Sequence, residues 1–442
     1  MVPSNDHHQP VLARTSKHRT LCDLPVELLS IIISHHIKHD RRTLRSCALT
    51  CPCLRAVAIE HLFSTGLSVT EIVSFDHLLS FLQDNPAISK KTRGLFLSGQ
   101  TRVKRDGLSV PLTKLDAPVV ARLLQLLPDL ASLRLWCFIY SLPPRAAPAS
   151  SSHTQEHIPG PFHLKFLRLG SSFYSLRSSF HARHHKSSIS GLFRILSLFS
   201  IDQLDAEHSV GEFKPSAPLD PTVLHRPLSI KKLQLSGYEY SDRKCPPLLI
   251  NAFAESIAPE GLQSLSTRCC SMATVSAIGK LLARGGSDLT SLDIGADAPD
   301  VSKREKWTDP LDNHWHRLDL TSCPKLESLV IHIYFRPPCS ASKPSNVPAL
   351  SLAGAGMLSQ TSQTLRRIRI CLYDLPRVTT LNNRRMLRLQ EFDKVLAADR
   401  FPDLEEVTME VHPEYSLRKR QRYNWQHIGL HARGLLTVRE RY

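Results

Sequence analysis

The residues of this chain best suited to chemistry are histidines and cysteines that stand in close pairs. The histidine pairs have a helical spacing and the cysteine pairs are almost adjacent: His35 and His39, His181 and His185, Cys51 and Cys53, Cys269 and Cys270. A helix can direct two such imidazoles toward one metal ion, but a zinc site needs further ligands, commonly a second C-x₂₋₄-C pair. The sequence contains no such second pair, so we expect neither a metal nor a cofactor.

Sequence motifs of catalysis are missing as well. We find no phosphate-binding glycine loop, nucleophile elbow, kinase signature or dinucleotide fingerprint. The run Gly354-Ala355-Gly356 lacks the third glycine of a dinucleotide loop and follows a segment rich in proline and serine, which is typical of a turn. Serine, histidine and aspartate residues are scattered along the chain, so we expect a protein that is not an enzyme.

The composition indicates a folded protein with a large core. Apolar residues make up 42% of the 442 residues, and 56 Lys and Arg against 40 Asp and Glu give a net charge of +16. The 11 cysteines are scattered, no Asn-x-Ser/Thr acceptor occurs, and residues 1–20 contain no apolar signal segment. The longest strongly apolar stretch, residues 28–33, is far shorter than the ~20 residues that span a bilayer. We therefore expect a cytoplasmic or nuclear protein with reduced thiols, no membrane partner and a disordered leader over residues 1–20.

Residues 21–65 predict three short helices that form one bundle. Pro25 suits the first turn of the first helix because its missing N–H costs nothing there. Asp40 can open the second helix, and Pro52 ends that helix and starts the third. Helical spacing places the following residues on one face of the first helix and on the inner faces of the second and third: Leu24, Leu28, Ile31, Ile32 and His35; Leu44, Cys47, Ala48 and Cys51; Leu54, Val57, Ala58 and Leu62.

Beyond these helices the sequence repeats the motif apolar-x-x-apolar-x-apolar. Successive copies start mostly 27–39 residues apart, and one gap of 66 residues corresponds to about two periods. The seven clear copies and two weaker ones are Leu130/Leu133/Leu135, Leu164/Leu167/Leu169, Ile230/Leu233/Leu235, Leu289/Leu292/Ile294, Leu326/Leu329/Ile331, Leu365/Ile368/Ile370 and Leu404/Val407/Met409, with Leu95/Leu97 and Leu262/Leu265.

The motif copies alternate along the chain with helix-like stretches, and this alternation of strand and helix predicts an α/β fold. The last two apolar residues of each copy are two positions apart, as on one face of a strand, and this apolar face must be covered by other residues. A helix after each strand supplies the cover, and a right-handed crossover through it returns the chain parallel to the previous strand. We expect an irregular leucine-rich-repeat solenoid over residues 66–411, with an ordinary α/β domain as the alternative. Helices are expected at 117–127, 189–199, 248–257, 272–282 and 386–397, and loop insertions near 143–161, 214–227 and 336–348.

The N-terminal bundle resembles an F-box. The matching segments are Leu24-Pro25-Val26-Glu27-Leu28-Leu29, Asp40-Arg41-Arg42-Thr43-Leu44, Cys47-Ala48-Leu49-Thr50-Cys51 and Ala58 through Phe63. Residues 75–97 are similar to the junction that follows the F-box in receptors of the fungal type. The family usually has a tryptophan near the end of the second helix or the start of the third, where this chain has Leu54, so we expect a looser bundle and an altered adaptor affinity.

The resemblance implies that the bundle docks on a Skp-type adaptor, which connects it to a cullin–RING ubiquitin ligase, and that the solenoid is the substrate receptor. A bundle of about forty residues also buries too little apolar surface to be stable alone, which favours a partner. The expected adaptor-binding residues are Leu24, Pro25, Leu28, Ile32, Leu44 and Leu49. The alternative is that about half of them only pack the interior of the bundle.

In a repeat stack, the residues between and just after the last two apolar positions face the open side of the sheet. Tryptophan and arginine often anchor interfaces, and arginine pairs with carboxylate and phosphate, so we hypothesise an acidic or phosphorylated protein target. The expected target-binding residues are Arg134, Trp136, Arg168, Arg268, His332 and Arg369, and Gln234, Asp293 and Glu410 share their face. The alternative is a solvated face without a ligand.

Residues 412–442 predict a basic tail. From Tyr415 onward the cations are Arg418, Lys419, Arg420, Arg422, Arg433, Arg439 and Arg441, against Glu440. One alternative function is therefore nucleic-acid binding, with the tail on phosphates and Tyr423 and Trp425 stacked on bases, although no nucleic-acid fold is recognisable. The other alternative is a protein-binding scaffold that joins no ligase.

Overall fold

The computed structural model describes residues 24–36, 40–64, 66–99, 113–142, 160–170, 188–208, 219–235, 247–269, 271–297, 314–334, 354–375, 392, 394–396, 400–413 and 436–440. The predicted leader, the pair His181 and His185, and most of the three predicted loop insertions lie outside these residues. The same is true of most of the helix expected at 386–397.

The three predicted N-terminal helices are confirmed as α1 (Val26–His36), α2 (Arg41–Thr50) and α3 (Pro52–Ser64). Asp40 caps α2, because its carboxylate accepts hydrogen bonds from the backbone N–H groups of Arg42 (3.0 Å) and Thr43 (3.3 Å) and from the Thr43 hydroxyl (2.6 Å). The helices enclose a small core of their own, separate from that of the rest of the chain: Leu29, Ile33, Leu44, Val57 and Ala58.

The remaining described residues form one large parallel sheet in an α/β arrangement. Twelve strands pair in the order in which they occur along the chain. They are β1 (Leu67–Ile72), β2 (Gly94–Gly99), β4 (Ser132–Trp136), β6 (Phe162–Gly170), β7 (Phe199–His208), β8 (Ser229–Gln234), β9 (Ser264–Cys269), β10 (Ser291–Asp297), β11 (Ser328–Tyr334), β12 (Arg367–Leu375), β13 (Glu406–Pro413) and β14 (Leu436–Glu440). A separate two-stranded parallel sheet joins β3 (Lys114–Leu115) to β5 (Ile139–Tyr140).

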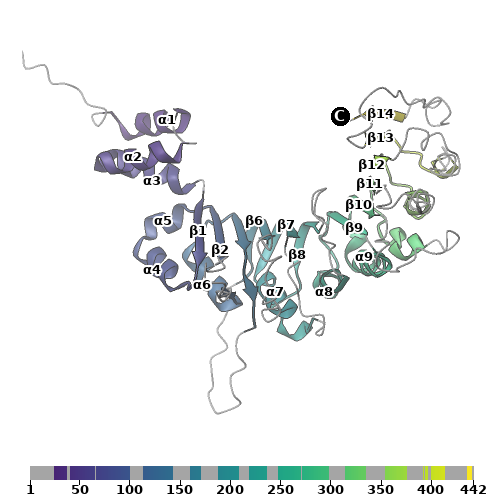
Figure 1. Cartoon of the computed structure of the whole chain (residues 1–442), viewed down its shortest axis with the longest axis horizontal. Coiled ribbons are helices and arrows are strands. Elements are labelled where there is room, and N and C mark those ends of the chain that lie inside the picture. Colours follow the sequence, from purple (N-terminus) through teal and green to yellow (C-terminus); the bar gives the residue numbers. More distant parts are fainter. Residues whose placement is uncertain are drawn as a thin grey trace, which may run out of the picture.

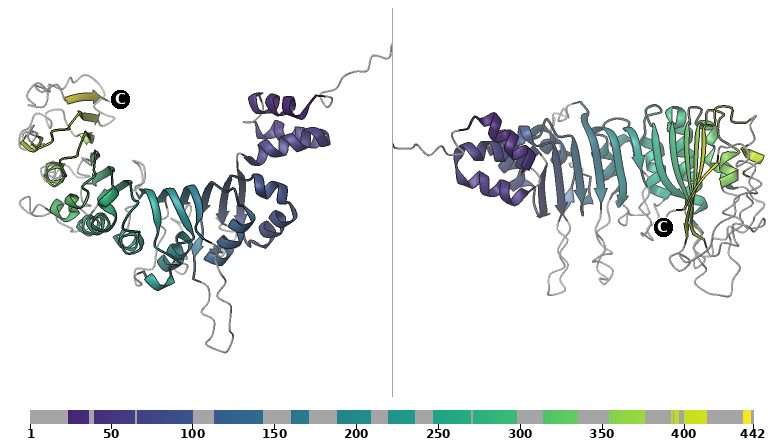
Figure 2. Two further views of the ribbon diagram at one scale, coloured as in Figure 1. Left: turned by 180° about the vertical axis from the view of Figure 1, so that it is seen from behind. Right: turned by 90° about the horizontal axis from the view of Figure 1, so that it is seen from above.

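The sheet curves into a crescent, with helices on its convex side and strands along its concave side (Figures 1 and 2). The helices are α4 (Asp76–Asp84), α5 (Pro86–Lys91), α6 (Ala117–Leu126), α7 (Ile189–Leu196), α8 (Pro247–Ser256) and α9 (Met272–Gly285), with 3₁₀ turns at η4 (Pro221–Val223), η5 (Gly286–Asp288), η7 (His314–Leu318) and η8 (Leu320–Ser322). Helices α6 to α9 pack on one another in chain order, and a single apolar core continues beneath the sheet from Ile72 to Val411. In the part of the chain that the structure covers, no helix combines the length and apolar character needed to cross a membrane.

Each of the seven predicted motif copies coincides with a strand, and all of their apolar residues are buried. The weaker copies at β2 and β9 also form strands. In each of them a buried threonine takes the motif position that lacks a large apolar residue: Thr92 is the first position before Leu95, and Thr267 is the last position after Leu265. The gap of 66 residues contains β7, whose motif ends in alanine (Ile201, Leu204, Ala206). Small or β-branched residues therefore satisfy the packing where the sequence pattern is weak.

The predicted C-terminal end of the repeat region needs correction. The repeat region was expected to end at residue 411 and to be followed by a basic tail. The sheet continues through β13 to Pro413 and adds β14, which pairs in parallel with β13 through Val407 and Leu436. Part of the expected tail is thus the last strand of the sheet, while residues 414–435 lie outside the described residues.

The bundle is attached to the first part of the sheet by more than the chain connection. Lys91 Nζ, at the end of α5, lies 2.9 Å from Glu60 Oε2 on α3. Gly66, between α3 and β1, has φ of +117°, a left-handed conformation that glycine adopts without steric cost. The bundle therefore stands at one end of the crescent, with α1 at the end away from the sheet (Figure 1).

Candidate functional site

Helix α1 carries an apolar face that no other described residue covers. Within the helix, Leu29 and Ile33 point into the bundle core, while the neighbouring stripe is exposed. The exposed apolar side chains of this stripe are Leu24, Pro25, Leu28, Ile31 and Ile32, which we call the α1 face. Val26 is also exposed, but its spacing puts it on the side of Leu29 and Ile33. A helix that is apolar on two sides can bury only one side within a bundle of three helices. The other side is therefore suited to contact with a partner protein.

The expected adaptor residues divide into two groups in the structure. Leu24, Pro25, Leu28 and Ile32 lie on the α1 face, and Leu49 on α2 is 88% exposed. Leu44 is only 1% exposed and belongs to the bundle core, which fits the alternative that some of these residues pack the interior of the bundle. Leu54 is half-buried against the same core.

The expected target residues all lie on the concave face of the sheet. Strand register joins Arg134 of β4 to Arg168 of β6, and continues across the sheet through Asp293 of β10 to Arg369 of β12 in one row. Trp136, Arg268, His332 and Glu410 stand two residues further along their strands. The buried residues that alternate with them face the helices, as in β11, where Leu329, Ile331 and Ile333 are buried.

Three of the target residues form a group at the N-terminal strands, which we call the N-terminal patch together with Phe166. The guanidinium of Arg134 lies 5.7 Å from the centre of the Phe166 ring, and Arg168 Nε lies 3.1 Å from Oδ2 of the buried Asp205. Trp136 extends over Gly170 on the neighbouring strand, where a Cβ atom would overlap the indole ring. The patch thus combines an exposed cation with two aromatic rings.

The other three target residues lie on β9, β11 and β12, so β7 and β8 separate them from the N-terminal patch. Here Arg268 extends over Gly295 and places its guanidinium 4.0 Å from the centre of the Tyr334 ring. Tyr334 stacks on Tyr373 at 4.6 Å between ring centres, and Tyr373 stacks on His412 at 4.4 Å. We call the stack of Arg268, Tyr334, Tyr373 and His412 the ladder.

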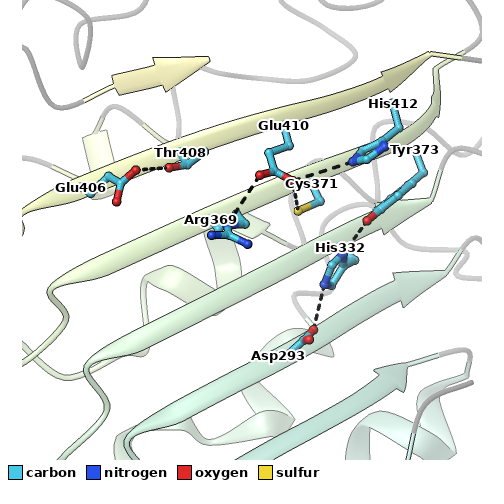
Figure 3. Close-up of polar contacts among 9 residues, drawn as sticks. All are labelled: Asp293, His332, Arg369, Cys371, Tyr373, Glu406, Thr408, Glu410 and His412. Atoms are coloured by element: carbon cyan, nitrogen blue, oxygen red, sulfur yellow. Dashed lines mark hydrogen bonds and ion pairs between the residues drawn. The ribbon is translucent and has the colours of Figure 1, made fainter. Parts of the chain in front are cut away.

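His332 fixes the ladder from its side. Its Nε2 atom lies 2.9 Å from Asp293 Oδ1 and its Nδ1 atom 3.1 Å from the Tyr373 hydroxyl (Figure 3). Because a carboxylate only accepts, Nε2 donates to Asp293, and in the tautomer with its proton on Nε2 the Nδ1 atom accepts from the Tyr373 hydroxyl. The orientation of Tyr373 therefore depends on a hydrogen-bonded chain that starts on β10.

A buried carboxylate lies beneath the other end of the ladder. Glu410 has a side chain only 4% exposed, and its oxygens lie 3.8 Å from Arg369 Nε and 3.9 Å from His412 Nε2 (Figure 3). The Cys371 thiol donates to Glu410 Oε2 at 3.8 Å. Burial, and then the nearby Glu410 carboxylate, raise the pKa of the Cys371 thiol to about 12, so this cysteine is protonated near neutral pH and is not a nucleophile.

The concave face has the chemical groups of a binding surface. Among the described residues, no group of three His, Cys, Asp or Glu side chains is placed to hold a metal ion. His35 and the pair Cys51 and Cys53 fall within the described bundle, whereas His39 and Cys270 do not. The groups that the concave face does provide, guanidinium, phenol, indole and imidazole, are those common at protein interfaces.

Sequence reasoning missed three members of the ladder, Tyr334, Tyr373 and His412. Each stands three residues after the last apolar residue of its motif copy, Ile331, Ile370 and Met409. This shared offset is the sequence signal that identifies them, because it continues the strand alternation beyond the motif onto the same face.

Comparisons with known proteins do not assign the chain to a family. No protein-family model matches it, and a search of curated proteins gives no significant match.

Proposed function

We propose that this protein is the substrate-receptor subunit of a ubiquitin ligase of the Skp–cullin–F-box type. In this proposal α1 to α3 are an F-box that docks on a Skp-type adaptor, and the curved sheet is an irregular leucine-rich-repeat domain that holds a protein target. The ligase chemistry belongs to other subunits. The observation that carries the proposal is the exposed α1 face on a bundle with a small core, in which the fully buried apolar residues among those described are Leu29, Ile33, Leu44, Val57 and Ala58.

Apolar burial explains why this face is suited to an adaptor. Side chains such as Leu28 and Ile31 are about half exposed, and covering each of them is worth roughly 1 kcal/mol at ~25 cal/mol per Å². A partner helix laid along the α1 face would therefore stabilise both the complex and the bundle. The similarity of the α1 start, Leu-Pro-Val-Glu-Leu-Leu, to the F-box start supports the Skp-type adaptor as that partner.

The separation of the two surfaces supports a receptor. The bundle stands at the end of the crescent, and the concave face with the N-terminal patch and the ladder lies along its inner side (Figures 1 and 2). An adaptor on the α1 face would leave the concave face accessible to a target. This is the division of labour that a substrate receptor needs.

Adaptor binding is the direct test. The full chain, co-expressed with a Skp-type adaptor, should bring the adaptor down in affinity purification. Leu28→Asp combined with Ile32→Asp should abolish this, because a carboxylate cannot be buried unpaired in an apolar interface. Val73→Asp is the control, since Val73 is an apolar residue outside the bundle and is 72% exposed. Val73→Asp should leave adaptor binding unchanged.

Two results would contradict the proposal. Adaptor binding that survives Leu28→Asp/Ile32→Asp would remove the α1 face from the interface. Adaptor binding without co-purification of a cullin would instead favour the scaffold that joins no ligase.

A further inference from the structure

The ladder is the most extended feature on the concave face. Its four stacked groups come from β9, β11, β12 and β13, and it crosses β10 at Gly295, the one position there without a side chain to interrupt it. A Cβ atom at Gly295 would lie 3.0 Å from Arg268 Cγ and 3.5 Å from Tyr334 Cε2. Glycine at this position thus permits the contact between Arg268 and Tyr334.

The stacking fixes what the ladder presents to the solvent. The planes of Tyr334 and Tyr373 differ by 9° and those of Tyr373 and His412 by 16°, so their ring faces cover one another. A ligand on the concave side therefore meets ring edges, together with the guanidiniums at the sides of the stack. The edge of an aromatic ring carries partial positive charge and attracts acceptors such as carboxylate oxygens.

Charged groups of both signs lie around the ladder. Arg369 has a side chain 48% exposed, whereas its counter-ion Glu410 is 4% exposed and cannot reach a ligand. Asp293 has a side chain 41% exposed, and its carboxylate is held by His332 at 2.9 Å. Arg369 is therefore the exposed cation of the site, and Arg268 is half-buried with its guanidinium beside Tyr334. The net charge of the chain, +16, would also steer an acidic partner toward it.

The dimensions of the ladder fit a short extended segment. Neighbouring strands lie ~4.8 Å apart, so the four intervals from β9 to β13 span about 19 Å. An extended polypeptide covers that length with about six residues at ~3.3 Å each.

We propose that the ladder, with Arg369, is a binding site for an extended acidic segment of a protein, with Asp or Glu carboxylates on Arg268 and Arg369 and the backbone along the ring edges. This deepens the proposed function and rests on its assignment of the concave face to target recognition. It does not depend on adaptor docking. The N-terminal patch is the weaker candidate for this ligand, because Arg168 is already neutralised by the buried Asp205 at 3.1 Å.

A selection from random peptides tests the site without knowledge of the target. Phage displaying random 12-residue peptides are selected on the immobilised full chain at physiological salt, and enriched peptides are synthesised and measured by fluorescence anisotropy. We expect enrichment of Asp and Glu. Arg268→Ala and Arg369→Ala should each weaken binding about tenfold or more, the usual size of a lost charge-assisted hydrogen bond. Arg134→Ala tests the N-terminal patch for the same ligand. Arg122→Ala is the matched control, an exposed arginine on helix α6 away from the concave face, and should change affinity by less than about twofold.

Gly295→Val separates the stack from simple charge attraction. It keeps every charge but occupies the space that Arg268 needs, so it should weaken the enriched peptides as strongly as Arg268→Ala. Arg268→Lys, which keeps the charge without the planar group, should also weaken them. Thermal melting of each variant checks that the fold is intact, and variants that melt early are replaced by Tyr373→Phe, which removes only the hydroxyl bonded to His332.

Several outcomes would overturn the proposal. They are peptides without acidic enrichment, acidic peptides that depend on Arg134 rather than Arg268, and a phosphoserine version of an enriched peptide that binds more than about tenfold tighter than its Glu version. Displacement of the peptides by a single-stranded oligonucleotide at equal concentration would assign the site to nucleic acid instead. Because the adaptor is absent from these measurements, their failure leaves the adaptor test unaffected, and the reverse also holds.

Discussion

Gly170 lies directly beneath the indole ring of Trp136, so that the ring occupies the space where a side chain on β6 would stand. Gly170→Ala should therefore displace the ring and destabilise the protein by about 1–3 kcal/mol, the usual cost of overpacking. Chemical denaturation of the full chain measures this. The same substitution in a Trp136→Leu background should cost much less, because the clash has been removed. Equal costs in the two backgrounds would show that the ring does not constrain Gly170.

Leu44 and Leu49 give opposite expectations within one helix. Leu44→Ala should destabilise the bundle by about 2–5 kcal/mol, because Leu44 is 1% exposed in a core of few residues. Leu49→Ala, at a side chain 88% exposed, should change stability by less than about 0.5 kcal/mol. Hydrogen exchange of the α1 to α3 amides reports the bundle separately from the sheet. Similar protection in both variants would contradict the assignment of Leu44 to the core.

The cap of α2 should make the bundle sensitive to acid. Hydrogen bonds from the Thr43 side chain and from the Thr43 and Arg42 backbones hold the pKa of Asp40 below its usual value. A carboxyl group with a lowered pKa stabilises the fold at neutral pH, and this contribution is lost as the pH falls below about 4.

Asp40→Ala should thus lower the melting temperature of the bundle at pH 7 and reduce its loss of stability in acid. Asp40→Asn is the control, since asparagine caps a helix without titrating. It should retain most of the stability at pH 7 and also lose the acid sensitivity. An unchanged pH profile in both variants would exclude Asp40 as the titrating group.

Cysteine reactivity should follow burial. The pKa values of the Cys371 and Cys323 thiols are each raised to about 12, chiefly by burial, so only about one molecule in ten thousand carries either thiolate at pH 8. Among the cysteines that the structure describes, iodoacetamide should therefore modify the half-buried Cys47 and Cys53 before Cys371 and Cys323, which should react only after denaturation. Mass spectrometry of timed digests measures the order. Early modification of Cys371 in the folded protein would indicate that the concave face opens around Glu410.

Much of the fold could be predicted from the sequence, because the apolar motif records both strand period and burial. Its seven clear copies located seven strands, and Asp40 and Pro52 marked helix starts. Strand β7 was missed because Ala206 ends its motif copy, and β14 because its residues lie in an arginine-rich segment. Local pattern identifies a strand only where large apolar residues fill the positions.

The candidate site was less predictable, because it depends on register between strands far apart in sequence. Alternation correctly put Arg268 and His332 on one face, but the contact of Arg268 with Tyr334 requires that Gly295 stand between them. The same limit applied to the bundle. The spacing of Leu28, Ile31 and Ile32 defined a face without showing whether it points inward, whereas Leu44 on the next helix lies in the core, as its predicted inner position implied.

The pairing of strands in chain order has a consequence for distance. Since each strand adds ~4.8 Å along the crescent, the number of strands before β9 works as a spacer of fixed length between the N-terminal helices and the Arg268 end of the stack. Gain or loss of one strand-helix unit would move a ligand bound at the ladder by ~4.8 Å relative to a partner bound at α1. Neither the ladder nor the α1 face would change.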